Sequence, residues 1–331
     1  PPFTGSTPKG KVTRTMATST GDPGLSIRRL QGSPRRRRKE TVVHGILGSA
    51  AGISLIVSLA IVVALIGQAV NFLTEVDLGQ LWTSGWFPRS GAGEYDVLTI
   101  FIGTVEVSMI AMVIAAPLGL GAAMYLSEYA TPRTRRRLKP ILETLAGIPS
   151  VVLGYFALQV INPVIVQSLF GVTSTFTIMA AGIGVGILTI PLVASVAEDA
   201  MYAVPGALRE AAYGIGARRR AVTTKVVFPA AVSGIMASLI LGFSRALGET
   251  MVVAIAAGAT SGATRHLNPL EPGQTMTGAI ASLAIGSDQV KGAGGLNPFD
   301  SLYFVGLLLF VFTLGLNLLS ERFVRRVRRD Y

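Results

Sequence analysis

Long apolar segments constrain this chain more than any other feature of its sequence. A helix needs about 20 apolar residues to cross the roughly 30 Å hydrocarbon core of a bilayer. Six segments of the 331-residue chain meet this requirement, at about 45–69, 98–126, 141–162, 174–198, 230–258 and 302–320. Only 14% of the residues are charged, whereas a soluble domain carries about 25%. We therefore predict an all-α fold, a polytopic membrane protein with six transmembrane helices.

Basic residues are spread very unevenly over the connecting segments. Of the 29 Lys and Arg residues, ten lie before the first apolar segment. Five lie in each of three further segments: 131–139, 200–228 and 321–331. The other connections hold only three: Arg89, Arg265 and Lys291. Because basic residues collect on the cytoplasmic side of a membrane, both termini are expected to be cytoplasmic. This pattern also accounts for the net charge of +11, so we expect no nucleic-acid partner.

The apolar segments divide the chain into three parts. Residues 1–43 are polar and basic, and we expect a disordered cytoplasmic tail that lies against anionic lipid. Residues 44–97 hold the first transmembrane helix and an outer loop. Residues 98–331 hold the remaining five helices, with a loop of special interest at 200–229.

The outer loops contain two apolar features. Trp82, Trp86 and Phe87 follow the first apolar segment, a position typical of aromatic residues at the membrane interface. The run from Met276 to Ile285 is too short to cross a bilayer and predicts a short surface or re-entrant helix.

Prolines interrupt three of the predicted helices. Pro117, Pro149 and Pro191 lie inside or near the middle of the second, third and fourth apolar segments. Each removes a backbone hydrogen bond and is expected to kink its helix. Broken helices are typical of translocation paths, but an ordinary kink explains the prolines equally well.

The loop between the fourth and fifth apolar segments carries the most specific motif. It has the pattern E-A-A-x3-G-x9-I-x-L-P. Val226 and Phe228 stand at the Ile and Leu positions of this pattern. The other positions match it with these residues: Glu210, Ala211, Ala212, Gly216 and Pro229. This pattern resembles the EAA loop of binding-protein-dependent ABC importer permeases. The resemblance implies that the loop docks on an ATPase subunit and transmits its motion. Pro205 to Tyr213 are expected to form the docking helix, because Pro is favoured early in a helix and Gly after its end.

A second motif lies inside the fifth apolar segment, at Ser244 to Thr250. A charged residue at the centre of a bilayer costs about 2.5–3.5 kcal/mol, so Arg245 is expected to have a role there. Glu249 lies four residues later, on the same helix face, and can pair with Arg245. The Arg side chain suits an oxyanion, to which Ser244 and Thr250 can add hydroxyl donors. The charge pair has two interpretations, an anion-binding site or a structural ion pair that fixes helix packing.

The sequence Arg-Ala-Leu-Gly-Glu-Thr-Met at 245–251 resembles the phosphate-specific ABC transporter permeases. Residues 125–130, 146–152 and 275–277 carry further similarity to that family. The Leu-Gly-Glu-Thr-Met form and the extra first helix favour its C-type subunit. The sequence departs from the family pattern at two places. Phe228 stands where Leu is usual, and the loop between Gly258 and Gly278 matches no pattern of the family.

The resemblance covers about residues 98–331 and implies a type I ABC importer permease fold in a bacterial cell (inner) membrane. It implies that the chain forms an anion path with a second phosphate permease subunit, as a heterodimer. Two ATPase subunits and an extracytoplasmic phosphate-binding protein complete the complex. ATP and Mg²⁺ are then expected on the ATPase subunits, because this chain has no G-x4-G-K-[S/T] motif.

No catalytic site, cofactor or metal site is expected in the chain itself. It contains no cysteine, and its two histidines, His44 and His266, are far apart in the sequence. Two other functions remain as alternatives. One is a permease for another oxyanion, such as sulfate or molybdate. The other is an ion-coupled secondary transporter, although such proteins normally contain inverted repeats, which we do not find.

Overall fold

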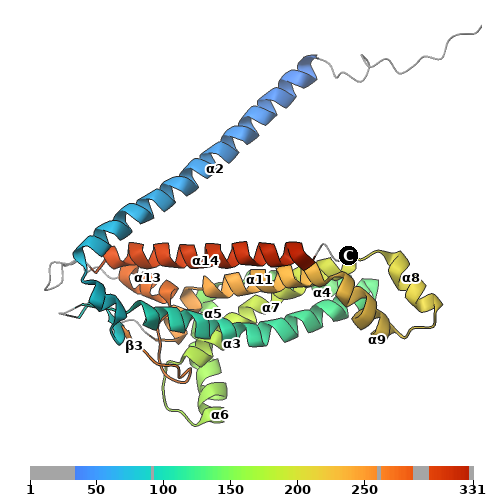
Figure 1. The fold of residues 1–331 in the computed structure, drawn as a ribbon. Coiled ribbons are helices and arrows are strands. Elements are labelled where there is room, and N and C mark those ends of the chain that lie inside the picture. The colour runs from blue at the N-terminus through green and yellow to red at the C-terminus, as the bar shows by residue number, and fades with distance from the viewer. Residues whose placement is uncertain (1–33, 91–92, 259–261, 286–297, 328–331) are drawn as a thin grey trace, which may run out of the picture. The chain divides into compact units, whose positions relative to one another are not determined.

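The computed structural model describes residues 34–90, 93–258, 262–285 and 298–327 (Figure 1). The chain divides into two compact units, Pro1–Leu59 and Ala60–Tyr331, which we describe separately. The described part of the first unit is the beginning of helix α2 (Pro34–Glu75). The prediction of a disordered tail is wrong for residues 34–43, which are helical, and residues 1–33 lie outside the described residues.

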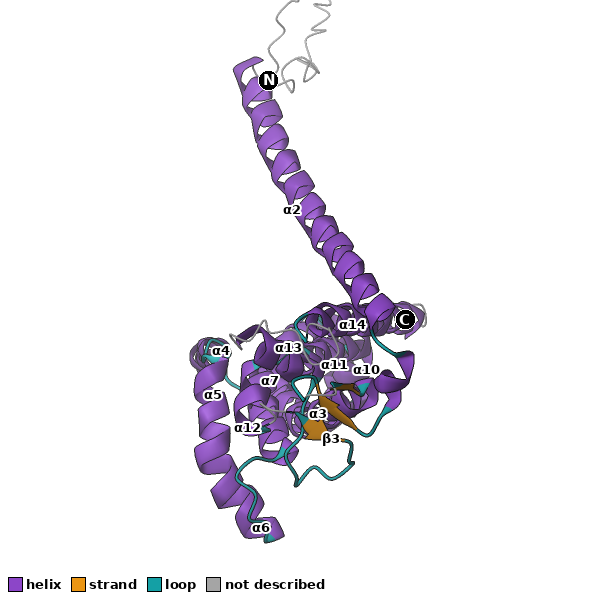
Figure 2. Cartoon of the chain, turned by 90° about the vertical axis from the view of Figure 1, so that its left-hand side faces the viewer, coloured by secondary structure: helices purple, strands orange, loops and turns teal. Residues whose placement is uncertain are grey.

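The second unit is a bundle of long helices with short elements at both ends (Figures 1 and 2). Its long helices are α3 (Val97–Met124), α7 (Ile178–Tyr202), α11 (Val232–Leu247) and α14 (Asp300–Val327). Helix α3 continues into a π-helical turn, η2 (Tyr125–Tyr129). One end of the bundle carries α8 (Gly206–Gly214), α9 (Arg219–Val222), η4 (Thr223–Val227) and α10 (Phe228–Ala230). We call it the α8 end.

The membrane prediction is confirmed for the described residues. Five helical segments there are long and apolar enough to cross a bilayer: Lys39–Glu75, Val97–Tyr129, Ser150–Phe170, Ile178–Tyr202 and Asp300–Arg322. A sixth is obtained if Arg219–Ala230 and Val232–Leu247, which meet at a bend of 73°, form one span. The fold is therefore an all-α polytopic membrane fold.

The third segment differs from the prediction of 141–162. The predicted segment begins inside a separate helix, α4 (Pro132–Leu145), and the apolar helix starts only at Ser150. Pro149 has a non-helical backbone at the N-cap, with φ −59° and ψ 129°, so it precedes this helix instead of kinking it. Pro117 and Pro191 lie within α3 and α7, as predicted. The segment consists of α5 (Ser150–Phe156), η3 (Ala157–Gln167) and α6 (Ser168–Phe170), and it runs across the bundle direction (Figures 1 and 2).

Glycines allow the long helices of the bundle to pack closely. A Cβ atom on Gly182 of α7 would lie 2.7 Å from Ile110 of α3. A Cβ atom on Gly234 of α11 would lie 2.3 Å from the Cβ of Ala200 on α7. Small residues at such contacts are typical of membrane helices, where close approach supplies much of the packing energy. Helices α3, α7 and α11 therefore form one tightly packed group.

The other end of the bundle, which we call the strand end, carries a small sheet. Its strands are β1 (Gly85–Phe87), β2 (Glu94–Tyr95) and β3 (Ala263–Thr264), in the antiparallel order β2-β1-β3. The turn η1 (Leu78–Trp82) and helices α12 (Met251–Ala256) and α13 (Met276–Ile285) complete this end. The short helix predicted at Met276–Ile285 is thus confirmed.

The predicted aromatic belt is wrong for one of its tryptophans. Trp86 is fully buried and packs edge-on against Tyr95, with ring centroids 5.8 Å apart. Phe72 packs against the same Tyr95 ring. Trp86 is therefore part of the core of the strand end, because strand pairing turns it inward, whereas Trp82 is 65% exposed.

Candidate functional site

The loop motif forms the short helix that the sequence predicts. Helix α8 follows Pro205, which is its N-cap residue. After the helix, the Gly216 N–H donates to the carbonyl of Tyr213 at 2.9 Å, and the Ala217 N–H donates to Ala212 at 3.1 Å. Gly216 has a φ of 80°, a left-handed conformation that costs a residue with a side chain roughly 1–2 kcal/mol. This glycine therefore ends the helix as expected.

Helix α8 presents different residues to solvent and to the bundle. Glu210 and Ala211 are exposed, whereas Ala212 is buried against a cluster that includes Met201 and Val222. Three large apolar side chains are also exposed on or next to this helix: Leu208, Tyr213 and Ile215. An exposed apolar surface of this kind on a loop is typical of an interaction site. Pro229 is partly buried and lies in α10, where the loop rejoins the bundle.

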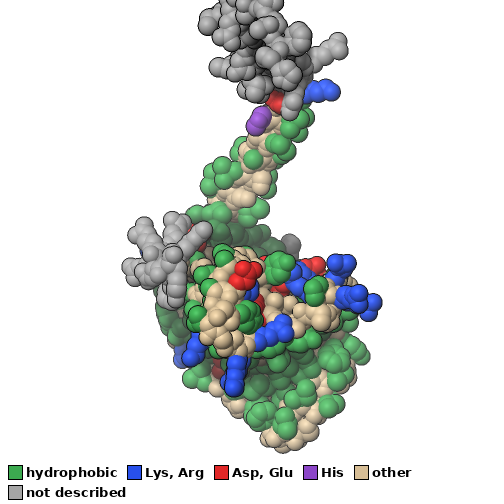
Figure 3. All heavy atoms as spheres, turned by 90° about the vertical axis from the view of Figure 1, so that its right-hand side faces the viewer, with side chains coloured by type: hydrophobic (Ala, Val, Ile, Leu, Met, Phe, Trp, Pro, Cys, Tyr) green, Lys and Arg blue, Asp and Glu red, His purple; other side chains and the backbone are tan. Residues whose placement is uncertain are grey.

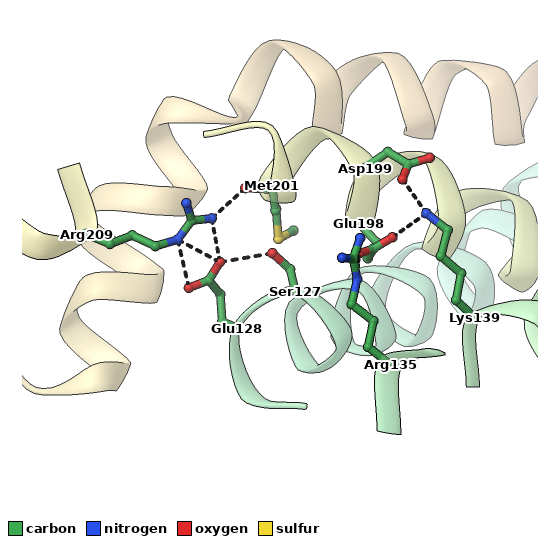
Figure 4. A network of polar contacts seen from close by, with 8 residues as sticks. All are labelled: Ser127, Glu128, Arg135, Lys139, Glu198, Asp199, Met201 and Arg209. Atoms are coloured by element: carbon green, nitrogen blue, oxygen red, sulfur yellow. Dashed lines mark hydrogen bonds and ion pairs between the residues drawn. The ribbon is translucent and has the colours of Figure 1, made fainter. Parts of the chain in front are cut away.

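Arg209, the neighbour of Glu210, connects α8 to two other elements (Figure 4). Its Nη2 donates to Oε1 of Glu128 in η2 at 2.9 Å and to the carbonyl of Met201 in α7 at 2.8 Å. Its Nη1 donates to the carbonyl of Val204 at 2.5 Å. Glu128 is buried and also accepts a hydrogen bond from Ser127 at 2.9 Å.

A second polar cluster connects α4 to α7 (Figure 4). The fully buried Glu198 accepts hydrogen bonds from Arg135 Nε at 2.6 Å and from Lys139 Nζ at 2.7 Å. Lys139 also pairs with Asp199. Burial alone would lower the pKa of Lys139, but the hydrogen bonds to Asp199 and Glu198 outweigh it, and the pKa is raised. Arg135 further stacks on the Tyr202 ring, 3.6 Å from its centroid.

Sequence reasoning missed these two clusters. The uneven distribution of basic residues accounts for Arg135, Lys139 and Arg209 by membrane orientation alone, although all three bind buried carboxylates. The adjacent acidic residues Glu198 and Asp199, at the end of the fourth apolar segment, were the sequence feature that could have indicated the α4–α7 cluster. Figure 3 shows the α8 end, where basic side chains are distributed over the surface among hydrophobic ones.

The intramembrane motif has a different structure from the one predicted. Helix α11 ends at Leu247, and α12 begins only at Met251. The Gly248 N–H donates to the carbonyls of Ser244 and Arg245, which closes the last turn, and the chain then leaves the helix. The fifth apolar segment, predicted as one helix over 230–258, is thus broken next to Arg245.

The predicted pairing of Arg245 with Glu249 is wrong. Their spacing of four residues does not place them on one helix face, because the helix stops between them. Both residues belong to the described part of the chain, and their side chains form no ion pair with each other. Arg245 is exposed on the surface of the chain, and Glu249 is partly buried.

The hydroxyl groups of the motif bind protein atoms. Ser244 Oγ donates to Asn317 Oδ1 of α14 at 2.9 Å, beside a groove of about 590 Å³ between α11 and α14. Thr250 Oγ1 donates to the carbonyl of Gly248 at 3.2 Å. The Glu249 carbonyl accepts a hydrogen bond from Thr277 Oγ1 of α13 at 2.8 Å, so α13 supports the break. Among the described residues, the Ser244 and Thr250 hydroxyl groups thus donate to Asn317 and Gly248 and not to Glu249.

One further acidic residue within an apolar helix was not predicted as a site residue from the sequence. Glu106 is the one acidic residue of the 98–126 segment and lies within α3. Its Oε2 atom is buried and has no hydrogen-bond partner among the described residues. A carboxylate in an apolar run was the signal that could have drawn attention to it.

Comparison with known proteins shows the family to which this chain belongs. The family described as "Binding-protein-dependent transport system inner membrane component" matches residues 115–329. The chain belongs to this family. The EAA-type loop lies within the matched region. The matched region also contains Arg245 and the break after α11.

Individual relatives agree with this assignment. The "Probable ABC transporter permease protein YqgH" of Bacillus subtilis is 32% identical over 88% of this chain and 94% of its own length. The "Phosphate transport system permease protein PstC" of Mesorhizobium japonicum is 30% identical over 87% of this chain and 90% of its own. A solved bacterial alginate ABC transporter has a similar fold, with a TM-score of 0.60 at 16% identity, over 88% of this chain and 97% of that one.

Proposed function

We propose that this chain is a membrane-spanning permease subunit of an ATP-driven phosphate importer. The observation that carries the proposal is the exposed Arg245 at a break in an apolar helix. An uncompensated Arg in lipid is very unfavourable, so this side chain must face protein or water. Similarity to phosphate transport permeases supports phosphate as the anion.

The anion path lies between this chain and a second, homologous permease subunit. Arg245 projects from the surface of α11 and does not form an ion pair with Glu249, so it is available at a subunit interface. A guanidinium group binds a phosphate oxyanion through two parallel hydrogen bonds. Glu249 lies at the same break and accepts a hydrogen bond from the hydroxyl group of a protonated phosphate, whereas fully deprotonated sulfate has no such hydroxyl group.

The exposed surface of α8 supports the proposed ATPase partner. Glu210 and the apolar side chains of Leu208, Tyr213 and Ile215 form a surface for one of two ATPase subunits, which bind ATP and Mg²⁺. An extracytoplasmic phosphate-binding protein delivers the anion at the strand end. A permease for sulfate or molybdate is the second candidate, because Arg245 suits any of these oxyanions.

The purified complex tests both the partners and the anion. We expect an ATPase subunit and a second permease to co-purify with this chain, and phosphate-loaded binding protein to stimulate ATP hydrolysis. Glu210→Lys should remove most of the co-purified ATPase because it reverses a charge on the docking surface. Glu143→Lys, an exposed change on α4, is the matched control. Stimulation by sulfate alone, or ATPase recovery unaffected by Glu210→Lys, would overturn the corresponding assignment.

The proposed orientation places both termini and α8 in the cytoplasm of a bacterial cell. Lys291, one of the predicted outer residues, lies outside the described residues, so we use Ser90, which is exposed and next to Arg89. The chain has no cysteine, so Ser90→Cys and Thr224→Cys each give a single label site. We expect a membrane-impermeant thiol reagent to label position 90 in intact spheroplasts and position 224 only after permeabilisation. The reverse pattern would contradict the proposed orientation.

A further inference from the structure

One side chain, Arg209, makes polar contacts from α8 to two membrane helices. Besides the short contacts described above, its Nε lies 3.3 and 3.4 Å from the two carboxylate oxygens of Glu128. Glu128 belongs to η2, which continues α3. The carbonyl of Met201 lies in the last turn of α7, and that of Val204 lies in the connection that leads from α7 to α8. Arg209 therefore joins α8, α3 and α7 at a single point (Figure 4).

Arg209 and Glu210 are consecutive but face different surroundings. The Arg209 side chain is 20% exposed, and its partner Glu128 is 4% exposed. Glu210 is exposed and belongs to the docking surface proposed above. Ala212, two residues later, is buried against the ends of the same helices. One face of α8 is thus attached to the bundle, while the other is open to a partner.

Stability alone is a weak explanation for this buried ion pair. Removing two charges from water is costly, and apolar residues of similar volume often give equal or better stability at such positions. The particular feature of Arg209 is its geometry, because a planar group with five donors can bind one carboxylate and two carbonyls together. A lysine has the same charge but presents a single nitrogen.

We propose that Arg209 is a positioning residue that couples α8 to the translocation helices. Displacement of α8 by an ATPase would be passed through Arg209 to the ends of α3 and α7. Helix α7 is in close contact with α11 at Ala200 and Gly234, and α11 carries Arg245. The proposal rests on the docking function proposed for α8. It adds the residue through which docking acts on the membrane helices.

The experiment uses the whole complex in proteoliposomes, with Arg209→Lys, Glu128→Gln and the double variant. Arg220→Lys, an exposed change in the same loop, is the control. We measure ATPase co-purification, basal and binding-protein-stimulated ATP hydrolysis, and anion uptake per ATP hydrolysed. We expect Arg209→Lys to retain the ATPase and its basal rate, while stimulation and uptake per ATP each fall about tenfold. The double variant should be no worse than Arg209→Lys, because both changes remove the same link.

Two results would overturn the proposal. The first is unchanged stimulation and uptake per ATP in Arg209→Lys. The second is that the amount of co-purified ATPase falls in proportion to uptake, in both Arg209→Lys and Glu128→Gln. The ion pair would then only keep α8 folded. The ratio of stimulated to basal hydrolysis does not depend on which anion is carried. If wild-type complex takes up no phosphate, the phosphate assignment fails, and this ratio still tests Arg209.

Discussion

Replacing Arg245 with Lys is expected to reduce phosphate uptake by the assembled complex about tenfold or more, since a charge-assisted hydrogen bond contributes roughly 1.5–3 kcal/mol. The substitution keeps the positive charge but removes the fork that binds two oxygens of one phosphate. Arg245 is exposed at the end of α11 and forms no ion pair with Glu249, so its loss leaves no carboxylate unpaired there. Uptake of labelled phosphate by proteoliposomes, normalised to the amount of complex, measures the effect.

Three further variants separate an anion-binding role from a packing role. Arg322→Lys, an exposed change on α14, is the control and should leave uptake unchanged. Glu249→Gln should change the rate or the oxyanion selectivity more than it changes expression. The exchange Arg245→Glu with Glu249→Arg should not restore uptake, because the two side chains are separated by the end of the helix. Near-normal uptake by Arg245→Lys, or full rescue by the exchange, would contradict an anion-binding role for Arg245.

The double substitution Arg135→Met with Lys139→Met is expected to destabilise the folded chain strongly. It leaves Glu198, which is fully buried, without either of its two cationic partners. Removing one partner of a buried ion pair costs roughly 3–5 kcal/mol, because an uncompensated charge remains in a low-dielectric site. The variant also removes the stacking of Arg135 on Tyr202 and the ion pair of Lys139 with Asp199, and both losses add to the destabilisation. The fraction of monodisperse protein after heating in detergent measures this effect.

The same site offers a matched control and a rescue. Arg136→Met with Arg137→Met removes two exposed charges from α4 and should have little effect on heat resistance. Adding Glu198→Gln to the damaging double variant should recover much of the stability, because the buried charge is then absent. If Arg135→Met with Lys139→Met is as stable as the control, the cluster does not hold α4 against α7.

Features that depend on local chemistry were predictable from the sequence. Apolar length alone predicted helices α2, α3, α7 and α14, because every backbone polar group in a bilayer must be satisfied within a helix. The start and end of α8 followed from Pro205 and Gly216, whose backbone preferences act locally. The ten-residue helix α13 was predicted from its length in the same way.

Features that depend on tertiary contacts were not predictable in this way. Glu198 and Lys139 lie 59 residues apart in the sequence, so their pairing has no local pattern. The break after Arg245 was missed because apolar composition continues through α12 and conceals the end of α11. Trp86 was assigned to the membrane interface because β1 is only three residues long and its pairing with β3 comes from a distant loop.

The most direct test of the account asks whether the α11 surface that carries Arg245 lines an aqueous path for the anion. Leu241 is 49% exposed and lies one turn before Arg245, so Leu241→Cys places a single thiol on that surface in the otherwise cysteine-free chain. Leu319→Cys on α14, where the residue is 63% exposed, provides the control. In the assembled complex with ATP and binding protein, we expect a charged thiol reagent to modify position 241 faster than position 319, and phosphate to slow that reaction. Equal inertness of both positions, or modification of position 241 that phosphate does not affect, would contradict an anion path at Arg245.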